Sequence, residues 1–231
     1  AAAAQSFVTT TFASTTGGSV GGMVYFDLDV TSAAGITVKQ LDINTPSASG
    51  ELRVYIGASP YMAIAASPGS WVEVASAGID AAGVDSPSVV CLGSGVFLPF
   101  GTHAVALSGT ALSQRYTVPG AGVPLVYANS DVTITTGAAS NLAFGGVQFS
   151  PRIWNGTLHY DLGQTTAFSC AYTTSIGVGC NAGATTWYER FSDLVGFDLA
   201  ATVVAPNTLH AVAAGEVGYL VVAASPGWHA P

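Results

Sequence analysis

The chain has 231 residues, of which 49% are hydrophobic and only 8% are charged. This length suffices for one large all-β domain, or for an ordinary domain with a small appendage, and does not fit a solenoid of many repeats. Five basic residues against 13 acidic ones give a net charge of −8. The basic surface that nucleic-acid binding requires is therefore missing, and we expect no nucleic-acid partner.

The N-terminal residues favour an exported protein. The chain begins Ala1-Ala2-Ala3-Ala4-Gln5 without a methionine, and small residues of this kind remain beside the cleavage site of a removed signal peptide. No stretch approaches the ~18 consecutive apolar residues of a membrane helix, so we expect no transmembrane segment. A secreted or cell-surface location follows as a prediction; a trimmed piece of a longer protein is the alternative.

Short β-branched and aromatic runs recur along the chain between clusters of Gly, Pro, Ser and Asn. This spacing is typical of an antiparallel β-sandwich or jelly roll, and it predicts an all-β fold. Strands are predicted over residues 7–12, 23–30, 36–43, 52–57, 71–77, 88–92, 103–108, 114–117, 125–128, 132–135 and 152–160.

The segment 23–30 shows the clearest alternation and reads as a half-buried strand. Four of its side chains are expected to point inward: Val24, Phe26, Leu28 and Val30. Three are expected to point outward: Tyr25, Asp27 and Asp29. The segment 36–43 has the same period with one slip near Gln40, which is a β-bulge or only noise in the pattern.

The composition of the chain changes after residue 160 to one rich in Gly, Ser and Thr, so we place a domain boundary near residue 162. Residues 1–162 are predicted to form the sandwich, and residues 163–231 a small disulfide-stapled α+β appendage. Its helix, the only one we predict in the chain, covers residues 186–194, where Trp187, Tyr188, Phe191 and Leu194 fall at helical spacing. Strand texture resumes over residues 201–205, 208–212 and 217–223.

Two of the three cysteines lie close together in the sequence, and the third lies far from them. Cys170 and Cys180 lie in one segment rich in Gly, Ser and Thr, where a disulfide between them would close a short loop. Cys91 lies in the apolar run Val89-Val90-Cys91-Leu92, which predicts a buried, inert thiol rather than a nucleophile. There is no CxxC pair of the kind that binds metals.

Three segments, 24–28, 127–132 and 149–160, resemble a group of secreted bacterial surface domains. Such domains occur in large exported proteins of planctomycete-like and related bacteria. The resemblance covers residues 6–160, and the region around residues 187–191 is similar to the segment that follows these domains. It implies a jelly-roll-like extracellular β domain, and no catalytic residue can be carried over from it.

The catalytic patterns in the sequence are weak. Residues 17–21 fit the G-x-S-x-G nucleophile elbow, but a strand rather than a helix is expected to follow, so we interpret them as a hairpin loop. None of the histidines, His103, His159, His210 and His229, has the spacing of a zinc site. Glycoside hydrolysis needs two facing carboxylates, and Glu51, Glu73 and Glu189 suggest no such pair. We predict no catalytic residue and no enzyme.

Calcium is a more plausible ligand than a substrate, because it binds several oxygen atoms and the chain offers two small acidic groups. These are Asp27 with Asp29, and Asp80 with Asp85. Neither matches the EF-hand pattern, and solvated acidic residues that keep a neutral surface soluble are the alternative. Apart from calcium, we predict no cofactor.

Aromatic side chains could build a platform for sugars. We single out Trp71, Tyr127 and Trp154 as candidate glycan-binding residues. In all-β proteins such residues more often fill the core or its rim, and that alternative stays open here.

These features favour a secreted, non-catalytic structural or adhesive module at a bacterial surface. A surface with few charges does little to keep strand edges apart, so edge pairing, or addition of residues 1–12 to the sheet of a neighbour, could assemble copies. The expected partners are further copies, other surface proteins or a polysaccharide. A carbohydrate-binding module, with or without calcium, is the first alternative, and an extracellular hydrolase is the second.

Overall fold

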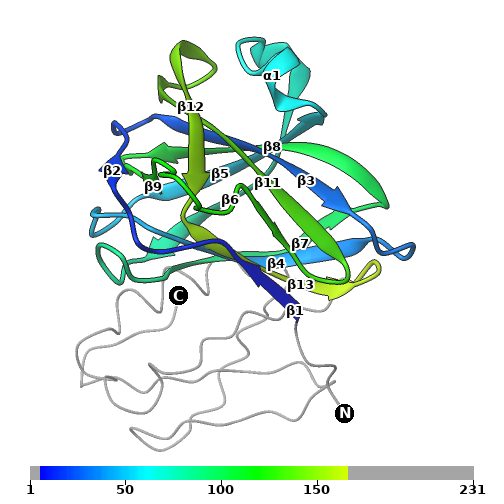
Figure 1. Cartoon of the computed structure of the whole chain (residues 1–231). Helices are drawn as coiled ribbons and strands as arrows, with labels where there is room; N and C mark the ends of the chain where they lie inside the picture. The colour runs from blue at the N-terminus through cyan, green and yellow to red at the C-terminus, as the bar shows by residue number, and fades with distance from the viewer. Residues whose placement is uncertain (1–5, 166–231) are drawn as a thin grey trace, which may run out of the picture. The chain divides into compact units, whose positions relative to one another are not determined.

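The computed structural model describes residues 6–165 (Figure 1). These residues form thirteen β-strands, one short α-helix and one 3₁₀ turn. The strands are β1 Ser6–Thr9, β2 Thr16–Gly17, β3 Met23–Val30, β4 Ile36–Ile43, β5 Glu51–Ala58, β6 Trp71–Asp80, β7 Ser88–Leu98, β8 Gly101–Thr110, β9 Arg115–Thr117, β10 Val126–Ala128, β11 Val132–Leu142, β12 Gly145–Trp154 and β13 Gly156–Leu162. The helix is α1, Tyr61–Ile64, and the turn is Pro68–Ser70.

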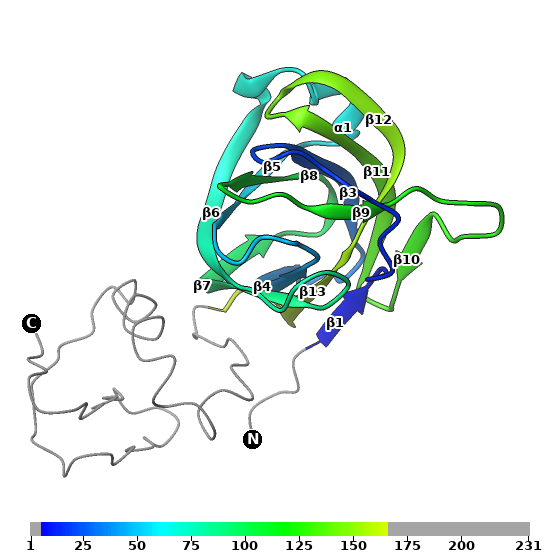
Figure 2. The same ribbon diagram turned by 90° about the vertical axis from the view of Figure 1, so that its left-hand side faces the viewer.

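The strands pair antiparallel in one curled sheet, in the order β1-β13-β4-β7-β6-β5-β8-β3-β11-β12-β9-β2, with β10 beside β11. The curl brings β13, β4 and β7 opposite β3, β5 and β8, so that two layers face each other (Figure 2). Strand β6 joins them, because it pairs with β5 along most of its length and with β7 at Ile79 and Asp80. The predicted all-β, sandwich-like fold is confirmed.

The core between the layers is apolar and close-packed. Phe26 of β3 and Trp154 of β12 stack there with ring centroids 5.1 Å apart, and both are at most 2% exposed. The residues around them come from both layers, so the inward-facing side chains of each layer pack against those of the opposite layer. Burial of each such large side chain contributes about 1.5–3 kcal/mol to folding.

Strand β3 coincides with the predicted segment, and its inward residues enter the core as expected. Tyr25 differs from the expectation of a solvent-facing residue, since it is 0% exposed. Its place in the strand puts it on the outer face of the layer, where α1 packs over it. The interpretation of this strand as half-buried is therefore wrong at Tyr25.

The slip in the segment 36–43 is a β-bulge. The register of β4 shifts against β7 between Val38 and Gln40, and that of β13 against β4 shifts at His159 and Tyr160. The extra residue keeps both Val38 and Leu41 in the core.

The predicted single strand 152–160 is wrong, because the chain breaks at Asn155 into β12 and β13. Strand β12 pairs with β11, whereas β13 pairs with β4 in the opposite layer. The backbone of Asn155 accepts a 3.1 Å hydrogen bond from Asn44, and its side chain donates one to Thr117. Asn155 thus holds the corner where the chain changes layers.

The four-residue helix α1 was not expected. Its first N–H, at Tyr61, donates to Asp27 of β3 at 3.0 Å, so the cap comes from a distant strand rather than from the adjacent sequence. Within the described part of the chain no helix is long or apolar enough to cross a membrane. The predicted helix 186–194 and nearly all of the predicted appendage lie outside the described residues.

Candidate functional site

A second group of packed side chains lies on the outer face of the layer formed by β3, β5 and β8. We call it the outer aromatic cluster: Tyr25, Tyr55, Tyr61, Trp71 and Phe144. Tyr25 is stacked on Tyr61 at 6.1 Å and lies 5.8 Å from Trp71. Phe144, from the turn between β11 and β12, contacts Tyr55 edge-on at 5.1 Å and Trp71 at 6.2 Å. The cluster therefore fixes both α1 and the β11–β12 hairpin to the sheet.

Polar atoms of this cluster bind groups that surround it. The indole Nε1 of Trp71 donates to the carbonyl of Ile64 at 3.0 Å, which ties the end of α1 to β6. Burial raises the pKa of both Tyr25 and Tyr61, so both hydroxyls stay protonated at neutral pH. The hydroxyl of Tyr25 points at the carbonyl of Ala65, 3.4 Å away.

Both segments held by the cluster carry exposed apolar side chains. Met62 of α1 is 70% exposed, and Leu142 and Val147 of the hairpin are 62% and 70% exposed. We call these three residues the apolar tips. Residues 59–70 and 138–151, which carry them, contain no charged side chain. Figure 1 shows α1 and the hairpin projecting from the same layer.

A charged group lies next to this face. Arg53 of β5 contacts the carboxylates of Glu51 at 2.9 Å and Glu73 at 3.7 Å, and Tyr55 follows two residues later on the same strand. All three charged side chains are about 40% exposed, and exposed ion pairs contribute only ~0–1 kcal/mol. Both carboxylates bind one guanidinium, which is not the arrangement of two carboxylates facing each other across a sugar.

Two of the three predicted glycan-binding residues, Trp71 and Trp154, are buried, so the prediction is wrong for them, while the role of Tyr127 stays a prediction. Trp154 is 2% exposed and fills the inner core, while Trp71 is 7% exposed and belongs to the outer aromatic cluster. Tyr127 is half-buried and packs against the inner core. The two tryptophans lie in different clusters. Because both are buried, neither presents a ring face to a ligand.

The predicted calcium ligands Asp27 and Asp29 lie on one face of β3, and each accepts hydrogen bonds from the protein. Asp27 accepts from Ser59 at 2.9 Å and from the N–H of Tyr61, and Asp29 accepts from Thr102 at 3.0 Å. Within residues 6–165 the structure gathers no three His, Cys, Asp or Glu side chains that could hold a metal ion. Calcium binding stays a prediction.

Asp80 and Asp85, the other predicted pair of calcium ligands, lie in different elements. Asp80 ends β6, while Asp85 lies in the loop before β7 and binds the N-terminal segment. Its carboxylate accepts hydrogen bonds from the backbone and hydroxyl of Ser14 and from the amide of Asn44. Arg115 donates to the same serine hydroxyl at 2.7 Å. We call Asp85, Ser14 and Asn44 the N-terminal latch.

The latch predicts a stability change in acid. The hydrogen bonds from Ser14, then those from Asn44, lower the pKa of Asp85 from 3.8 to about 2. A depressed pKa stabilises the folded state above the unfolded value and loses that contribution as the pH falls through about 2. We expect the melting temperature to drop between pH 4 and pH 2 less steeply in Asp85→Asn than in the natural protein, as followed by circular dichroism.

Ser14→Ala serves as the matched variant, because it removes one donor and keeps the carboxylate. Its acid dependence should lie between those of the natural protein and Asp85→Asn. Identical slopes in all three proteins would contradict the assignment.

The histidines and the glycine-rich loop show no catalytic arrangement in the described residues. His103 of β8 contacts the carbonyl of Pro99 at 2.8 Å. His159 of β13 contacts Asp42 of the neighbouring strand β4 at 2.7 Å. His210 and His229 lie outside the described residues. Residues 18–22 connect β2 to β3, which do not pair with each other, so the hairpin loop expected at residues 17–21 is wrong. The strand that follows is also not the helix of a nucleophile elbow.

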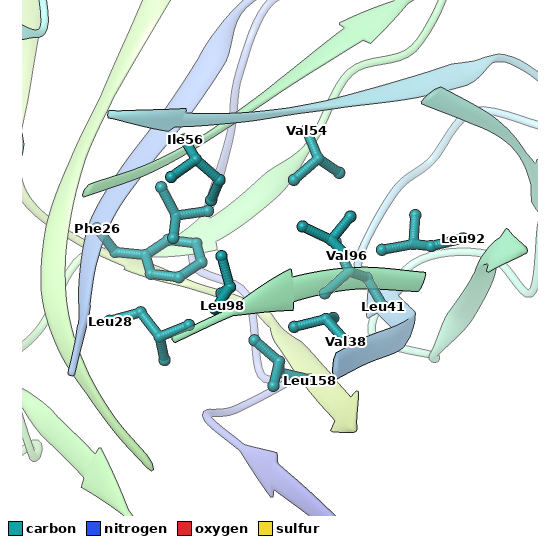
Figure 3. Close-up of a pocket in the computed structure, with 11 residues that line it drawn as sticks. Phe26, Leu28, Val38, Leu41, Val54, Ile56, Leu92, Val96, Leu98 and Leu158 are labelled. Atoms are coloured by element: carbon teal, nitrogen blue, oxygen red, sulfur yellow. The ribbon is translucent and has the colours of Figure 1, made fainter. Parts of the chain in front are cut away.

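A cavity of about 20 Å³ lies in the core between the layers (Figure 3). Its wall is apolar throughout, from Phe26 and Leu28 on one layer to Val38 and Leu158 on the other. A buried water needs two to four polar partners, and ligand pockets are more than tenfold larger, of the order of 300–1,000 Å³. This cavity is therefore a dry packing void and not a binding site.

Cys91 differs from its prediction in two ways. It is half-buried rather than buried, since it alternates with the core residues Val90 and Leu92 and so lies on the outer side of β7. It is also disulfide-bonded, so the prediction of an inert thiol is wrong. Cys170 and Cys180, the predicted pair, lie outside the described residues.

No protein-family model matches the chain, and no curated protein matches it. Among solved structures, a clostridial cysteine protease, Cwp84, in a variant form after propeptide cleavage, is similar with a TM-score of 0.42 and 14% sequence identity. The match covers 69% of this chain and 40% of that one. A similarity at this level carries no argument about function.

Sequence reasoning missed the outer aromatic cluster and the apolar tips. Their residues come from five separate segments of the chain, which only the sheet brings together. The one local signal was the absence of charge over residues 59–70 and 138–151.

Proposed function

We propose that this chain is a non-catalytic module of a secreted structural or adhesive protein, and that copies of it associate through the apolar tips. The observation that carries the proposal is the exposure of Met62, Leu142 and Val147 on two segments that the outer aromatic cluster holds in place. Contiguous exposed apolar patches mark interaction surfaces, and in this proposal the three tips contribute to one such patch.

The rigid base of the tips favours binding. Ordering a flexible loop on association costs about 0.5–1.5 kcal/mol for each immobilised side chain. Phe144 and Tyr61 are already packed against the sheet, so the cost of ordering these two side chains is met before a partner arrives. Neither segment contains a charged side chain, so association does not require ionised groups there to lose their hydration. The net charge of −8 therefore comes from other parts of the chain.

Assembly by strand addition is less favoured by the structure. Among residues 1–12, which were expected to join a neighbouring sheet, Ser6–Thr9 form β1, and this strand already pairs with β13 of the same chain. The carbonyl of Phe7 accepts a 2.9 Å hydrogen bond from Asn129, so the outer edge of β1 is partly capped. Addition to a neighbour would require release of this strand, whereas the apolar tips need no rearrangement.

The test is the oligomeric state of the double variant Leu142→Asp/Val147→Asp, measured by light scattering and sedimentation over a range of concentrations. We expect the natural protein to associate and the variant to weaken association at least tenfold, a change of about 1.4 kcal/mol. Phe100→Asp is the matched control, because Phe100 is 66% exposed in the turn between β7 and β8. Circular dichroism checks that each variant is folded.

A monomeric natural protein at all concentrations would overturn the proposal, as would an equal loss of association in the control.

Glycan binding is the second candidate, favoured by the half-buried ring of Tyr55 beside Arg53 and Glu73. Binding to a polysaccharide that is lost in Tyr55→Ala and retained in Leu142→Asp/Val147→Asp would support this candidate instead.

A further inference from the structure

The outer face of the layer formed by β13, β4 and β7 is polar and yet buried. On β4, Thr37, Gln40 and Asp42 lie outside the apolar core but are only 1%, 4% and 8% exposed. The outer face of an antiparallel sheet normally meets water. The side-chain oxygen of Gln40 is buried and has no hydrogen-bond partner in the described part of the chain.

The last described residues turn onto this face. The hydroxyl of Thr37 donates to the carbonyl of Gly163 at 2.6 Å and accepts from the N–H of Thr165 at 3.1 Å. Lys39 donates to the carbonyl of Thr165 at 3.1 Å and to that of Ser94, in β7, at 2.6 Å. Residues 163–165 therefore lie on the outside of β4, beside β7.

Cys91 lies on the same face. It is directly opposite Gln40 in the pairing of β4 with β7, and Gln40 is opposite His159 in the pairing with β13. Cys91 is disulfide-bonded, and the chain has only two other cysteines, both of which follow Thr165.

We propose that Cys170 is the disulfide partner of Cys91. Cys170 is five residues after Thr165, and these five steps span up to about 17 Å. The path from Thr37 to the position of Cys91 is about 10 Å along β4 and about 5 Å across to β7. Cys170 is therefore within reach.

Cys170 is the favoured partner over Cys180 because it closes the shorter loop from the anchored Thr165, which costs less conformational entropy. This assignment replaces the expected Cys170–Cys180 bond and leaves Cys180 as a thiol. It goes beyond the proposed function and does not depend on it. The bond forms when two thiols exchange with a small or protein disulfide, which takes up the two electrons and two protons and leaves as two thiols.

The experiment is peptide mapping of the oxidised full-length protein after alkylation of free thiols under denaturing conditions. Trypsin should yield residues 54–115, which contain Cys91, linked to residues 153–190, which contain the other two cysteines. Further cleavage by chymotrypsin after Phe168 and Tyr172 separates residues 169–172 from residues 173–187. We expect residues 169–172 to be linked to Cys91 and Cys180 to be alkylated.

A bond between Cys91 and Cys180, a bond between Cys170 and Cys180, or alkylated Cys91 would each overturn the assignment. Variants give an independent readout through the effect of reductant on the melting temperature. The Cys180→Ser variant, the matched control, should lose stability on reduction as the natural protein does. Cys91→Ser and Cys170→Ser should each be insensitive to reductant, and sensitivity in either of them would contradict the proposal.

Discussion

Replacing Trp154 with alanine should destabilise the protein by about 3–5 kcal/mol, which is the range for removal of a large buried aromatic side chain. Trp154 is 2% exposed and stacks on Phe26 in the core between the two layers. Because it is the last residue of β12, its loss leaves a cavity at the corner where the chain changes layers. Urea denaturation followed by tryptophan fluorescence and circular dichroism measures the free energy of unfolding.

Trp154→Phe separates packing from hydrogen bonding at this site. The indole Nε1 of Trp154 is buried and has no partner among the described residues, so phenylalanine removes an unsatisfied donor while keeping most of the ring. We expect it to cost less than half as much as alanine. Phe100→Ala, at a residue that is 66% exposed, should change stability by no more than about 0.5 kcal/mol. Equal effects of Trp154→Ala and Phe100→Ala would contradict the described core.

Replacing Gly137 with alanine should destabilise the protein by at least about 3 kcal/mol, at the upper end of the range for overpacking. Gly137 lies in β11 where the register shifts against both neighbouring strands. A Cβ atom at this position would lie 1.5 Å from the carbonyl oxygen of Tyr25 and 2.8 Å from the Cα of Phe26. Since both are backbone atoms of β3, the strands themselves must separate to make room.

Gly120→Ala is the matched control for this substitution. A Cβ atom there would have no neighbour within 4 Å, so alanine restricts only the unfolded chain. We expect the control to be neutral or to stabilise the protein by up to about 1 kcal/mol. Chemical denaturation of both variants provides the comparison, and a Gly137→Ala protein as stable as the control would show that β11 does not approach β3 as described.

The sequence predicted well the strands in which alternation is uninterrupted. Residues 23–30 and 36–43 became β3 and β4 without a change of boundary, and the slip near Gln40 proved to be a bulge. Longer strands were underestimated. Strand β11 runs to Leu142, well past the predicted end at residue 135, because pairing with β12 continues through residues whose composition is typical of loops.

Predictions of individual roles fared worse, since a role depends on what lies across the fold. Trp154 and Trp71 have the residue type of a sugar platform, yet both are buried. Asp85 has the residue type of a metal ligand, and the structure uses it to hold Ser14, which is 71 residues away in sequence. The apolar run around Cys91 suggested a buried thiol, because sequence does not reveal which of two alternating faces a strand turns to the core.

The sequence by itself determined the class of fold, because the two-residue alternation, the β-branched and aromatic runs and the turn-forming clusters are local properties of the chain. Only the tertiary structure decided which outward residues are exposed. Tyr25 alternates with the core residues of β3 as a solvent-facing residue would, but α1 and the β11–β12 hairpin cover it. Exposure at such a position is set by packing between segments far apart in sequence, on which the local pattern carries no information.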